Sequence, residues 1–271
     1  MSGDDSIISV RGLTCGYGHE LILKDVSFDV RRGEIFVIIG GSGCGKSTLL
    51  KQMIGLYEPQ AGQILLQGRD IVSADGAERL SILRGIGVMY QMGALFGAMS
   101  VVQNVRLPLE AFTDLPAAAI DAIARFKLAL VGLSDAATLM PSELSGGMQK
   151  RAAIARAMAL DPAILFLDEP SAGLDPITSA GLDDLVKSLA ETLGITFVIV
   201  SHELASIDAI ADSVIMLDKE TKGIVAQGEP KLLNDSPDPK VRAFFRRTAL
   251  APVAPLEGAP LALTTAKEVH L

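Results

Sequence analysis

A glycine-rich run between an apolar segment and a helical segment constrains the fold of this 271-residue chain more than any other feature. Residues 40–48 read Gly-Gly-Ser-Gly-Cys-Gly-Lys-Ser-Thr, directly after the apolar residues 35–39 and ahead of the helix-forming residues 49–53. Glycines allow consecutive backbone N–H groups to point at phosphate oxygens, and the start of a helix adds positive potential. The run fits the pattern GxxxxGK(S/T) and therefore predicts a strand, a phosphate-binding loop and a helix.

The loop also predicts individual phosphate and metal ligands. Lys46 would neutralise charge on the β- and γ-phosphates of a nucleotide, and Ser47 would offer its hydroxyl to Mg²⁺. The residues expected to surround the phosphates are Gly40, Gly41, Ser42, Gly43, Cys44, Gly45, Lys46, Ser47 and Thr48. Phosphate binding alone does not name a reaction.

Strand patterns on both sides of the loop predict an α/β fold. Residues 7–11 and 26–30 alternate between apolar and polar side chains, which is typical of a small antiparallel β layer at the N-terminus. Residues 35–39, 164–167 and 196–200 are continuously apolar, as in parallel strands that are covered on both faces. Helical patterns lie between these runs, so we expect a mostly parallel core sheet.

Two helical regions are predicted from the spacing of apolar side chains. One stops at Gly194, directly before the last apolar run, and carries Leu182, Leu185, Val186, Leu189 and Leu193 on one face. The other lies in a stretch rich in helix formers, is entered near Pro116 and left before Pro141, and carries Ile123, Phe126, Leu130 and Leu133 on one face. We expect roughly residues 92–160 to form a helical subdomain inserted in the sheet domain.

Two carboxylates end the second apolar run. Asp168 and Glu169 directly follow residues 164–167. Asp168 can hold Mg²⁺, directly or through water, and Glu169 can polarise an attacking water molecule. Together with the phosphate-binding loop, they supply a metal site and a base for in-line attack on a γ-phosphate, which predicts nucleotide hydrolysis.

A third motif lies between the first two. Residues 144–148 read Leu-Ser-Gly-Gly-Met and open an alanine-rich helical stretch. The chain here resembles the ATP-binding cassette (ABC) family, matching its LSGGQ motif with methionine in the place of glutamine. The resemblance covers about residues 7–230. It implies the P-loop NTPase fold of the ABC cassette, with ATP as the nucleotide, Mg²⁺ as the metal and residues 1–245 as the ATPase domain. The proline-bearing composition near the end of the chain, without any sustained period, predicts that residues 246–271 form a C-terminal tail.

Further elements of that family follow in the same order along the chain. The resemblance implies that Tyr17 stacks on adenine, that residues 171–175 form the D-loop, and that Ser145, Gly146 and Gly147 complete the ATP site of a second subunit in a head-to-tail homodimer. It implies that the catalytic residues are Glu169, His202, Lys46 and Gln91, and that Ser47, Gln91 and Asp168 contact the metal.

Segments outside these general motifs add detail. They are residues 89–96, with Gly-Ala-Leu-Phe after Gln91 and Met92, and residues 101–105, 107–109, 175–178 and 237–244. These segments resemble the phospholipid-transport ATPases of the Mla and Mce group. That resemblance implies phospholipid transport between inner and outer membranes, which maintains outer-membrane lipid asymmetry. It also implies an integral-membrane permease, an MCE-domain lipid-binding protein and often a STAS-domain subunit as partners, and a peripheral location at the cytoplasmic face of the inner membrane.

Composition agrees with such a subunit. The formal net charge of −8 argues against a broad nucleic-acid-binding surface, so we expect no nucleic-acid partner. The apolar runs are far shorter than the roughly 20 residues that cross a bilayer, so we expect no membrane span. The acidic start lacks the features of a secretory signal, and the only cysteines, Cys15 and Cys44, are expected to be reduced thiols in the cytosol.

Three alternatives to this function stay open from the residues. The cargo can be an amino acid, a metal complex or a drug, because such an ATPase does not touch its cargo. A soluble ABC mechanoenzyme of translation or DNA repair is disfavoured, because those proteins usually carry two cassettes or a long coiled-coil insertion. A cassette that binds ATP without hydrolysing it is disfavoured by the intact residues Lys46, Asp168, Glu169 and His202.

Two features depart from the family pattern. Lys150 stands where many relatives carry another residue, and the alanine- and proline-rich residues 251–271 match nothing recognisable. The segment Phe244-Phe245-Arg246-Arg247 either anchors a contact with a partner ATPase or belongs to a solvated end of the chain.

Overall fold

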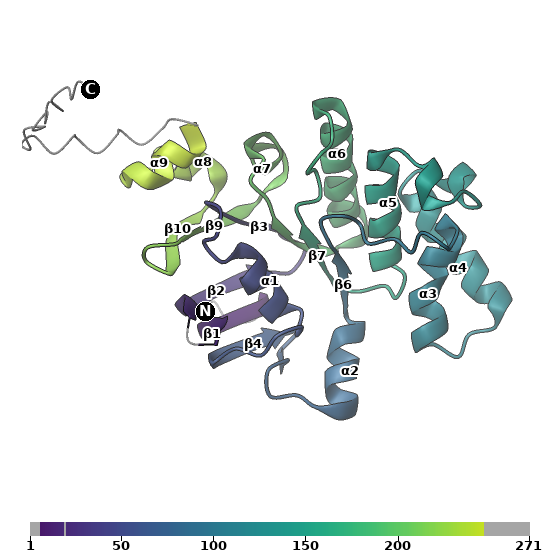
Figure 1. Cartoon of the computed structure of the whole chain (residues 1–271), viewed down its shortest axis with the longest axis horizontal. Coiled ribbons are helices and arrows are strands. Elements are labelled where there is room, and N and C mark those ends of the chain that lie inside the picture. Colours follow the sequence, from purple (N-terminus) through teal and green to yellow (C-terminus); the bar gives the residue numbers. More distant parts are fainter. Residues whose placement is uncertain (1–5, 19, 247–271) are drawn as a thin grey trace, which may run out of the picture.

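The computed structural model describes residues 6–18 and 20–246, and its strands form two sheets (Figure 1). Sheet A is antiparallel, with the order β2 (Glu20–Arg31), β1 (Ser6–Tyr17), β4 (Ala61–Leu66) and β5 (Arg69–Asp70). Sheet B has the order β10 (Gly223–Gly228), β9 (Ser213–Asp218), β3 (Ile35–Gly40), β8 (Thr196–Val200), β7 (Ile164–Asp168) and β6 (Ile86–Met89). Only β10 runs antiparallel to its neighbour in sheet B, so the predicted mostly parallel core sheet is confirmed.

Helices cover both faces of sheet B. Their bounds are α1 (Lys46–Met53), α2 (Gly76–Arg84), α3 (Val101–Phe112), α4 (Ala117–Leu130), α5 (Gly146–Ala157), α6 (Pro176–Leu193), α7 (Leu204–Ile210), α8 (Pro230–Leu233) and α9 (Pro239–Arg246), with short 3₁₀ turns at Ser134–Ala136 and Pro141–Glu143. In Figure 1, α6 and α7 lie on one side of this sheet, and α1 lies on the other side together with sheet A. Among the described residues, no helix is long and apolar enough to cross a membrane.

The central strand β3 contributes to two separate cores. Ile35, Val37 and Ile39 are buried on the face that α6 and α7 cover. Phe36 and Ile38 are buried on the opposite face, against α1 and sheet A. Because both faces are covered, no position of this strand is left for a polar side chain, which explains the continuous apolar runs in the sequence.

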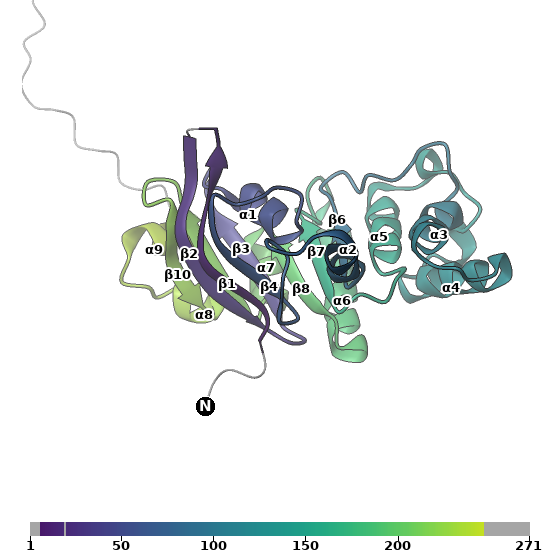
Figure 2. The ribbon, with the colours of Figure 1, turned by 90° about the horizontal axis from the view of Figure 1, so that it is seen from below.

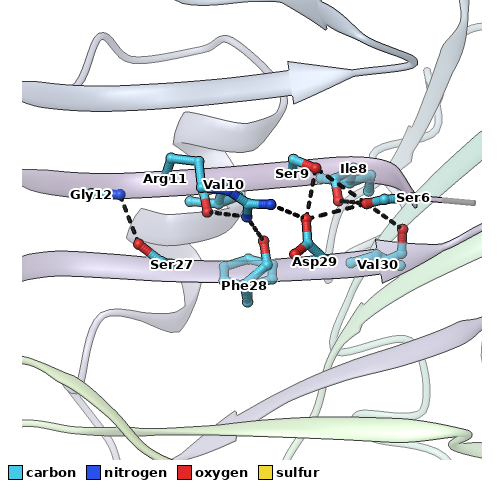
Figure 3. A network of polar contacts seen from close by, with 10 residues as sticks. All are labelled: Ser6, Ile8, Ser9, Val10, Arg11, Gly12, Ser27, Phe28, Asp29 and Val30. Carbon is cyan, nitrogen blue, oxygen red and sulfur yellow. Dashed lines mark hydrogen bonds and ion pairs between the residues drawn. The ribbon is translucent and has the colours of Figure 1, made fainter. Parts of the chain in front are cut away.

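Sheet A is fastened by a polar network on its outer surface (Figure 3). Asp29 of β2 accepts hydrogen bonds from Arg11 Nη2 at 2.6 Å and Ser9 Oγ at 2.7 Å, both on β1. Burial disfavours the ionised carboxyl group, but the hydrogen bonds from Ser9 and Arg11 outweigh this effect and lower the pKa of Asp29. The strands are longer than the predicted residues 7–11 and 26–30, because register shifts interrupt their alternation without ending the pairing.

The helices α3, α4 and α5 form a group inserted between β6 and β7, at the end of the molecule opposite α9 (Figures 1 and 2). This insertion, with the antiparallel sheet A and the mostly parallel sheet B, confirms the predicted fold class. The bounds proposed for the domain and for the inserted subdomain, 1–245 and 92–160, stay predictions.

The predicted apolar face of α4 is wrong at Phe126, which is 58% exposed. Ile123 and Leu130 are partly buried against the core, and Leu133 is buried but lies beyond the end of the helix. The side chains that α4 buries fully are Ile120, Ala124, Lys127 and Leu128. By contrast, α6 buries Leu182, Val186 and Leu189 as predicted, leaves Leu193 exposed, and ends at Gly194 in the left-handed conformation with φ 66°. At the C-terminal end of the described chain, Phe245 is buried in the chain's own core and is not free to anchor a partner. The proposed tail lies, apart from Arg246, outside the described residues.

Candidate functional site

The phosphate-binding loop connects β3 to α1 and requires glycine at defined positions. Gly40, Gly43 and Gly45 have φ values of 146°, 74° and 106°, which side chains other than glycine rarely adopt. A Cβ atom at Gly40 would also lie only 2.4 Å from the carbonyl oxygen of Leu217 on β9. Strand β9 therefore passes directly behind the loop and forces the chain to turn there.

Lys46 extends back over this loop from the first turn of α1. Its Nζ donates hydrogen bonds to the carbonyl oxygens of Gly40 at 2.8 Å and Gly41 at 3.1 Å. Ser47, the next residue, is exposed, whereas Cys44 is buried, and burial raises the pKa of its thiol. The loop thus presents a cation, a hydroxyl group and a helix N-terminus together, which suits a polyphosphate.

Sheet A brings Tyr17 to the same helix. The Tyr17 hydroxyl lies 3.5 Å from Oγ1 of Thr48, and the ring meets Tyr57 edge to face with centroids 6.0 Å apart. About half of the Tyr17 side chain stays exposed. An exposed aromatic ring beside the phosphate-binding loop suits the adenine-stacking role that the resemblance implies.

The end of β7 places a carboxylate that can bind a metal ion near the phosphate-binding loop. Oδ1 of Asp168 is buried and has no hydrogen-bond partner among the described residues. Burial raises the pKa of this carboxyl group, and the neighbouring charge of Glu169 raises it further. Attraction to Lys51, Lys46 and Lys150 opposes both effects. An orphaned buried carboxylate oxygen fits a bound cation, which would satisfy the oxygen and favour the ionised form.

Glu169 and His202 meet at the ends of the neighbouring strands β7 and β8. Nδ1 of His202 lies 2.8 Å from Oε2 of Glu169, whose side chain is 13% exposed. The backbone of Glu169 has a φ of 48°, an unusual value for this residue, and its N–H donates to the carbonyl of Val200 at 2.9 Å. A carboxylate in a sparsely populated backbone conformation, oriented by an imidazole, has the form of a general base with its positioning partner.

Gln91 follows β6 in an exposed segment that two cations of α5 hold. Lys150 donates to the carbonyl oxygen of Gln91. Arg156 donates to the carbonyls of Gly93 at 2.9 Å and Ala94 at 2.7 Å. The segment after Gln91 is therefore attached to the helix that begins with the Leu-Ser-Gly-Gly-Met motif.

That motif itself lies away from the loop within one chain. Ser145 caps α5 by accepting a hydrogen bond from the N–H of Met148 at 3.3 Å, and Gly146 and Gly147 form the first turn. In Figures 1 and 2, β6 and β7 lie between α5 and α1, which carries Lys46. The chain thus brings Tyr17, Lys46, Asp168 and Glu169 to one region and leaves Ser145 at another.

The sequence marks one contributor to the site, Lys150, only as a departure from the family pattern. It is 7% exposed and reaches both Gln91 and Glu169 through their backbone carbonyls. The sequence does hold a signal: Lys150 lies three and four residues before Ala153 and Ile154, both fully buried, and so shares the buried face of α5.

A phosphate-binding loop, a strand-end Asp-Glu pair and a histidine from the next strand define the class of P-loop ATPases. Within this class, the ABC transporter family model matches residues 23–172, and the chain belongs to that family. It is therefore an ABC-type ATPase.

Individual relatives indicate which ABC ATPases this chain is similar to. The chain is similar to the intermembrane phospholipid transport system ATP-binding protein MlaF of Escherichia coli K12, with 41% identity over 249 residues, 92% of this chain and 91% of the relative. It is also similar to the "Probable ribonucleotide transport ATP-binding protein mkl" of Mycobacterium leprae, with 39% identity over 91% of this chain and 70% of the relative.

A solved structure supports the fold independently. The dimeric post-hydrolysis state of the ATP-binding cassette MJ0796, bound to ADP and Pi, superposes with a TM-score of 0.73 at 30% identity. The match covers 82% of this chain and 98% of that protein. The fold described above is thus that of an ATP-binding cassette over nearly the whole length of the solved protein.

Proposed function

We propose that this chain is the ATP-hydrolysing subunit of a transporter that moves phospholipid between the inner and outer membranes of a double-membraned cell envelope. The observation that carries the proposal is the 41% identity to a phospholipid-transport ATP-binding protein along 91% of that relative. The ribonucleotide named for the Mycobacterium leprae relative is the second candidate cargo, because the identity there is 39%. Phospholipid is favoured because this chain covers only 70% of that second relative.

The proposed mechanism begins with ATP bound at the loop. Backbone N–H groups of residues 40–48 and the Lys46 ammonium group hold the β- and γ-phosphates, and Tyr17 stacks on adenine. Their arrangement at the ends of β1 and β3 supports this assignment.

Hydrolysis then depends on Glu169. Its carboxylate accepts a proton from a water molecule whose oxygen attacks the γ-phosphorus, while the bond from phosphorus to the bridging oxygen of ADP breaks. The contact of 2.8 Å between His202 and Glu169 keeps the carboxylate aimed at that water, with the imidazole N–H donating. Gln91 is assigned to the water and metal side of the same site.

Mg²⁺ is the metal that this donor set fits. Ser47 and Asp168 would hold it, with Gln91 as a third contact, and the orphaned Oδ1 of Asp168 supports the assignment. When bound, the ion neutralises charge on the β- and γ-phosphates and so stabilises the phosphoryl group in transfer.

We assign the second half of each ATP site to a partner copy. Ser145, Gly146 and Gly147 of one chain would contact the γ-phosphate held by Lys46 of the other, in a head-to-tail homodimer. Two observations support this: α5 lies away from α1 within one chain, and the related cassette MJ0796 is dimeric in its post-hydrolysis state. Loss of the γ-phosphate removes a ligand that both chains hold, so the dimer opens.

The membrane partners belong to the same proposal. We assign an integral-membrane permease, an MCE-domain lipid-binding protein and a STAS-domain subunit as partners, and the cytoplasmic face of the inner membrane as the location. The ATPase itself is then a peripheral subunit that the permease recruits.

Two substitutions test the catalytic assignment. Lys46→Ala should abolish ATP binding or turnover, because it removes the cation at the phosphates. Glu169→Gln should bind ATP, accumulate as a dimer and hydrolyse ATP about 10²–10⁴-fold more slowly, because it removes the base. ATP binding by filter retention, dimerisation by light scattering and phosphate release measure these effects. Turnover at the wild-type rate in either variant would contradict the assigned roles.

Co-purification tests the cargo. The tagged chain is extracted from its own membranes in mild detergent, and the proteins and lipids that accompany it are identified by mass spectrometry. A permease together with an MCE-domain protein and phospholipid supports the proposal. A permease of another type with ribonucleotide or another solute, or ribosomes, would overturn the phospholipid assignment and leave the ATPase standing.

A further inference from the structure

Lys150 forms an unusual set of contacts for a buried lysine. From the second turn of α5, its ammonium group donates to the carbonyl oxygen of Gln91 and to the carbonyl oxygen of Glu169, the latter at 3.4 Å. These residues lie 59 positions before it and 19 positions after it in the chain. One side chain of the inserted helices therefore connects two loops of the candidate site.

The partners of Lys150 distinguish it from a lysine buried for stability alone. Lys127, the comparable buried lysine of α4, forms an ion pair with the carboxylate of Asp161. No carboxylate within residues 6–18 and 20–246 lies within ion-pair distance of Lys150. Burial lowers the pKa of Lys150, although the charges of Asp168 and Glu169 oppose this effect. The position carries a desolvation cost that no direct ion pair offsets.

The two carbonyls fix the backbone at the two loops. At Glu169, the N–H donates to the carbonyl of Val200. The carbonyl accepts from the N–H of Ala172 at 3.2 Å and from Lys150 at 3.4 Å, so both backbone polar groups of the residue are held. This holds the strained backbone conformation, φ 48°, that sets the direction of its side chain. At Gln91, the same ammonium group holds the carbonyl of the residue. Six residues further along α5, Arg156 holds the carbonyls of Gly93 and Ala94.

We propose that Lys150 is a positioning residue, which couples the start of α5 to the base Glu169 and to the Gln91 loop so that all three move together. The proposal rests on the function proposed above, since it assumes that Glu169 is the general base. Ser145 lies at the start of the same helix. When Ser145 contacts the γ-phosphate of the ATP held by the partner chain, α5 therefore also aligns Glu169 of the chain that carries Ser145. In this proposal Lys150 acts through its two carbonyl contacts and not as a ligand of ATP.

The test uses the full-length chain and three substitutions. Lys150→Met keeps an unbranched side chain, one atom shorter, and a similar helix propensity but removes the donor. Lys150→Arg keeps donors for both carbonyls. Lys127→Met removes the other buried lysine and serves as the matched control, because its partner Asp161 lies outside the site. Measurements are the rate of a single turnover of bound ATP, the Kd for ATP and the thermal midpoint of unfolding.

The expected result separates chemistry from binding. Lys150→Met should slow the single turnover by about 10–100-fold with a Kd for ATP within about threefold of wild type, because misalignment by about 1 Å costs up to about 10²-fold. Lys150→Arg should restore the rate to within about fivefold of wild type. Lys127→Met should lower the thermal midpoint at an unchanged turnover rate. In a Glu169→Gln background, Lys150→Met should change the residual rate by less than about twofold, because the residue acts through the base.

Other results would overturn the inference. A Lys150→Met chain that turns over ATP at the wild-type rate removes the positioning role. A Lys150→Met chain that loses rate only in proportion to its folded fraction removes it as well. A raised Kd with an unchanged rate assigns Lys150 to ATP binding instead. If Glu169→Gln itself hydrolyses ATP normally, the proposed base is wrong; if only the Lys150 result fails, the base stands and the coupling does not.

Discussion

The replacement of Asn104 by leucine tests how the loop ahead of α3 is held. Asn104 is completely buried, and its Oδ1 accepts from the N–H of Phe96 at 2.8 Å. Its Nδ2 donates to the carbonyls of Phe96, Met99 and Ser100, each at 3.1 Å. A single side chain thus binds backbone groups at both ends of the segment 96–100, which lies between the Gln91 segment and α3.

The magnitude follows from these bonds. An amide has two N–H groups, so at most three full hydrogen bonds are lost, at about 1 kcal/mol each. The part-buried N–H of Phe96 is left without its partner, which costs a further ~1–2 kcal/mol, while the added apolar burial of leucine returns ~1 kcal/mol. The expected loss of unfolding free energy is therefore about 3–4 kcal/mol.

Denaturant unfolding of the full chain measures this loss. The urea midpoints of wild type, Asn104→Leu and the neighbouring Gln103→Leu are compared at a common slope. Gln103 is the control, since its exposed side chain accepts a single bond from Ser100 N at 2.8 Å and its loss should cost only ~0.5–1 kcal/mol. A loss below ~1 kcal/mol for Asn104→Leu, or equal losses for the two variants, would refute the reasoning.

Two further predictions concern the loop and a buried thiol. Gly40→Ala should prevent folding or lower the unfolding free energy by roughly 3 kcal/mol or more, because the added Cβ would lie 2.4 Å from the Leu217 carbonyl oxygen. The control Gly41→Ala adds a Cβ that meets nothing within 4 Å, so it should melt like wild type. Equal melting temperatures for the two variants would contradict this. Burial raises the pKa of Cys15 from 9.0 to about 11, so its neutral thiol contributes stability that is complete below pH 9 and is lost as the pH rises through about 11. Between pH 9 and 11, the unfolding free energy of Cys15→Ala should fall by ~2–3 kcal/mol less than that of wild type, as measured by denaturant titration at each pH. Parallel plots of unfolding free energy against pH for the two proteins would contradict the assignment.

The fold was predictable where one local pattern determines the structure. The strands at residues 35–39, 164–167 and 196–200 were found because coverage of both sheet faces leaves an apolar run. The stop of α6 at Gly194 was found because a left-handed residue there needs glycine.

The burial pattern of α4 could not be predicted from apolar spacing. Its buried face includes Ala124, which is small, and Lys127, which is charged and pairs with Asp161. An apolar periodicity therefore selects Ile123 and Phe126 instead, and Phe126 is exposed. Only the distant position of Asp161 explains why a lysine is buried there.

The candidate site shows the same division between local and long-range information. The glycine loop and the Asp168-Glu169 pair were found because each is contiguous in sequence and follows an apolar strand. The links that Lys150 and Asn104 form depend on which loops the fold brings beside α5 and α3. Such contacts leave only a polar residue on a buried helix face as their trace in the sequence.

The side chains of β3 alternate between the two cores, which has a consequence for how a destabilising substitution in this strand would be detected. Substitution of Val37 would weaken the packing beneath α6 and α7, and substitution of Phe36 would weaken the packing against α1 and sheet A. The two substitutions would act in different cores, yet the same loop, residues 41–45, follows the strand in both cases. Because the phosphate-binding loop follows directly on β3, we expect ATP binding at this loop to be sensitive to packing defects in either core.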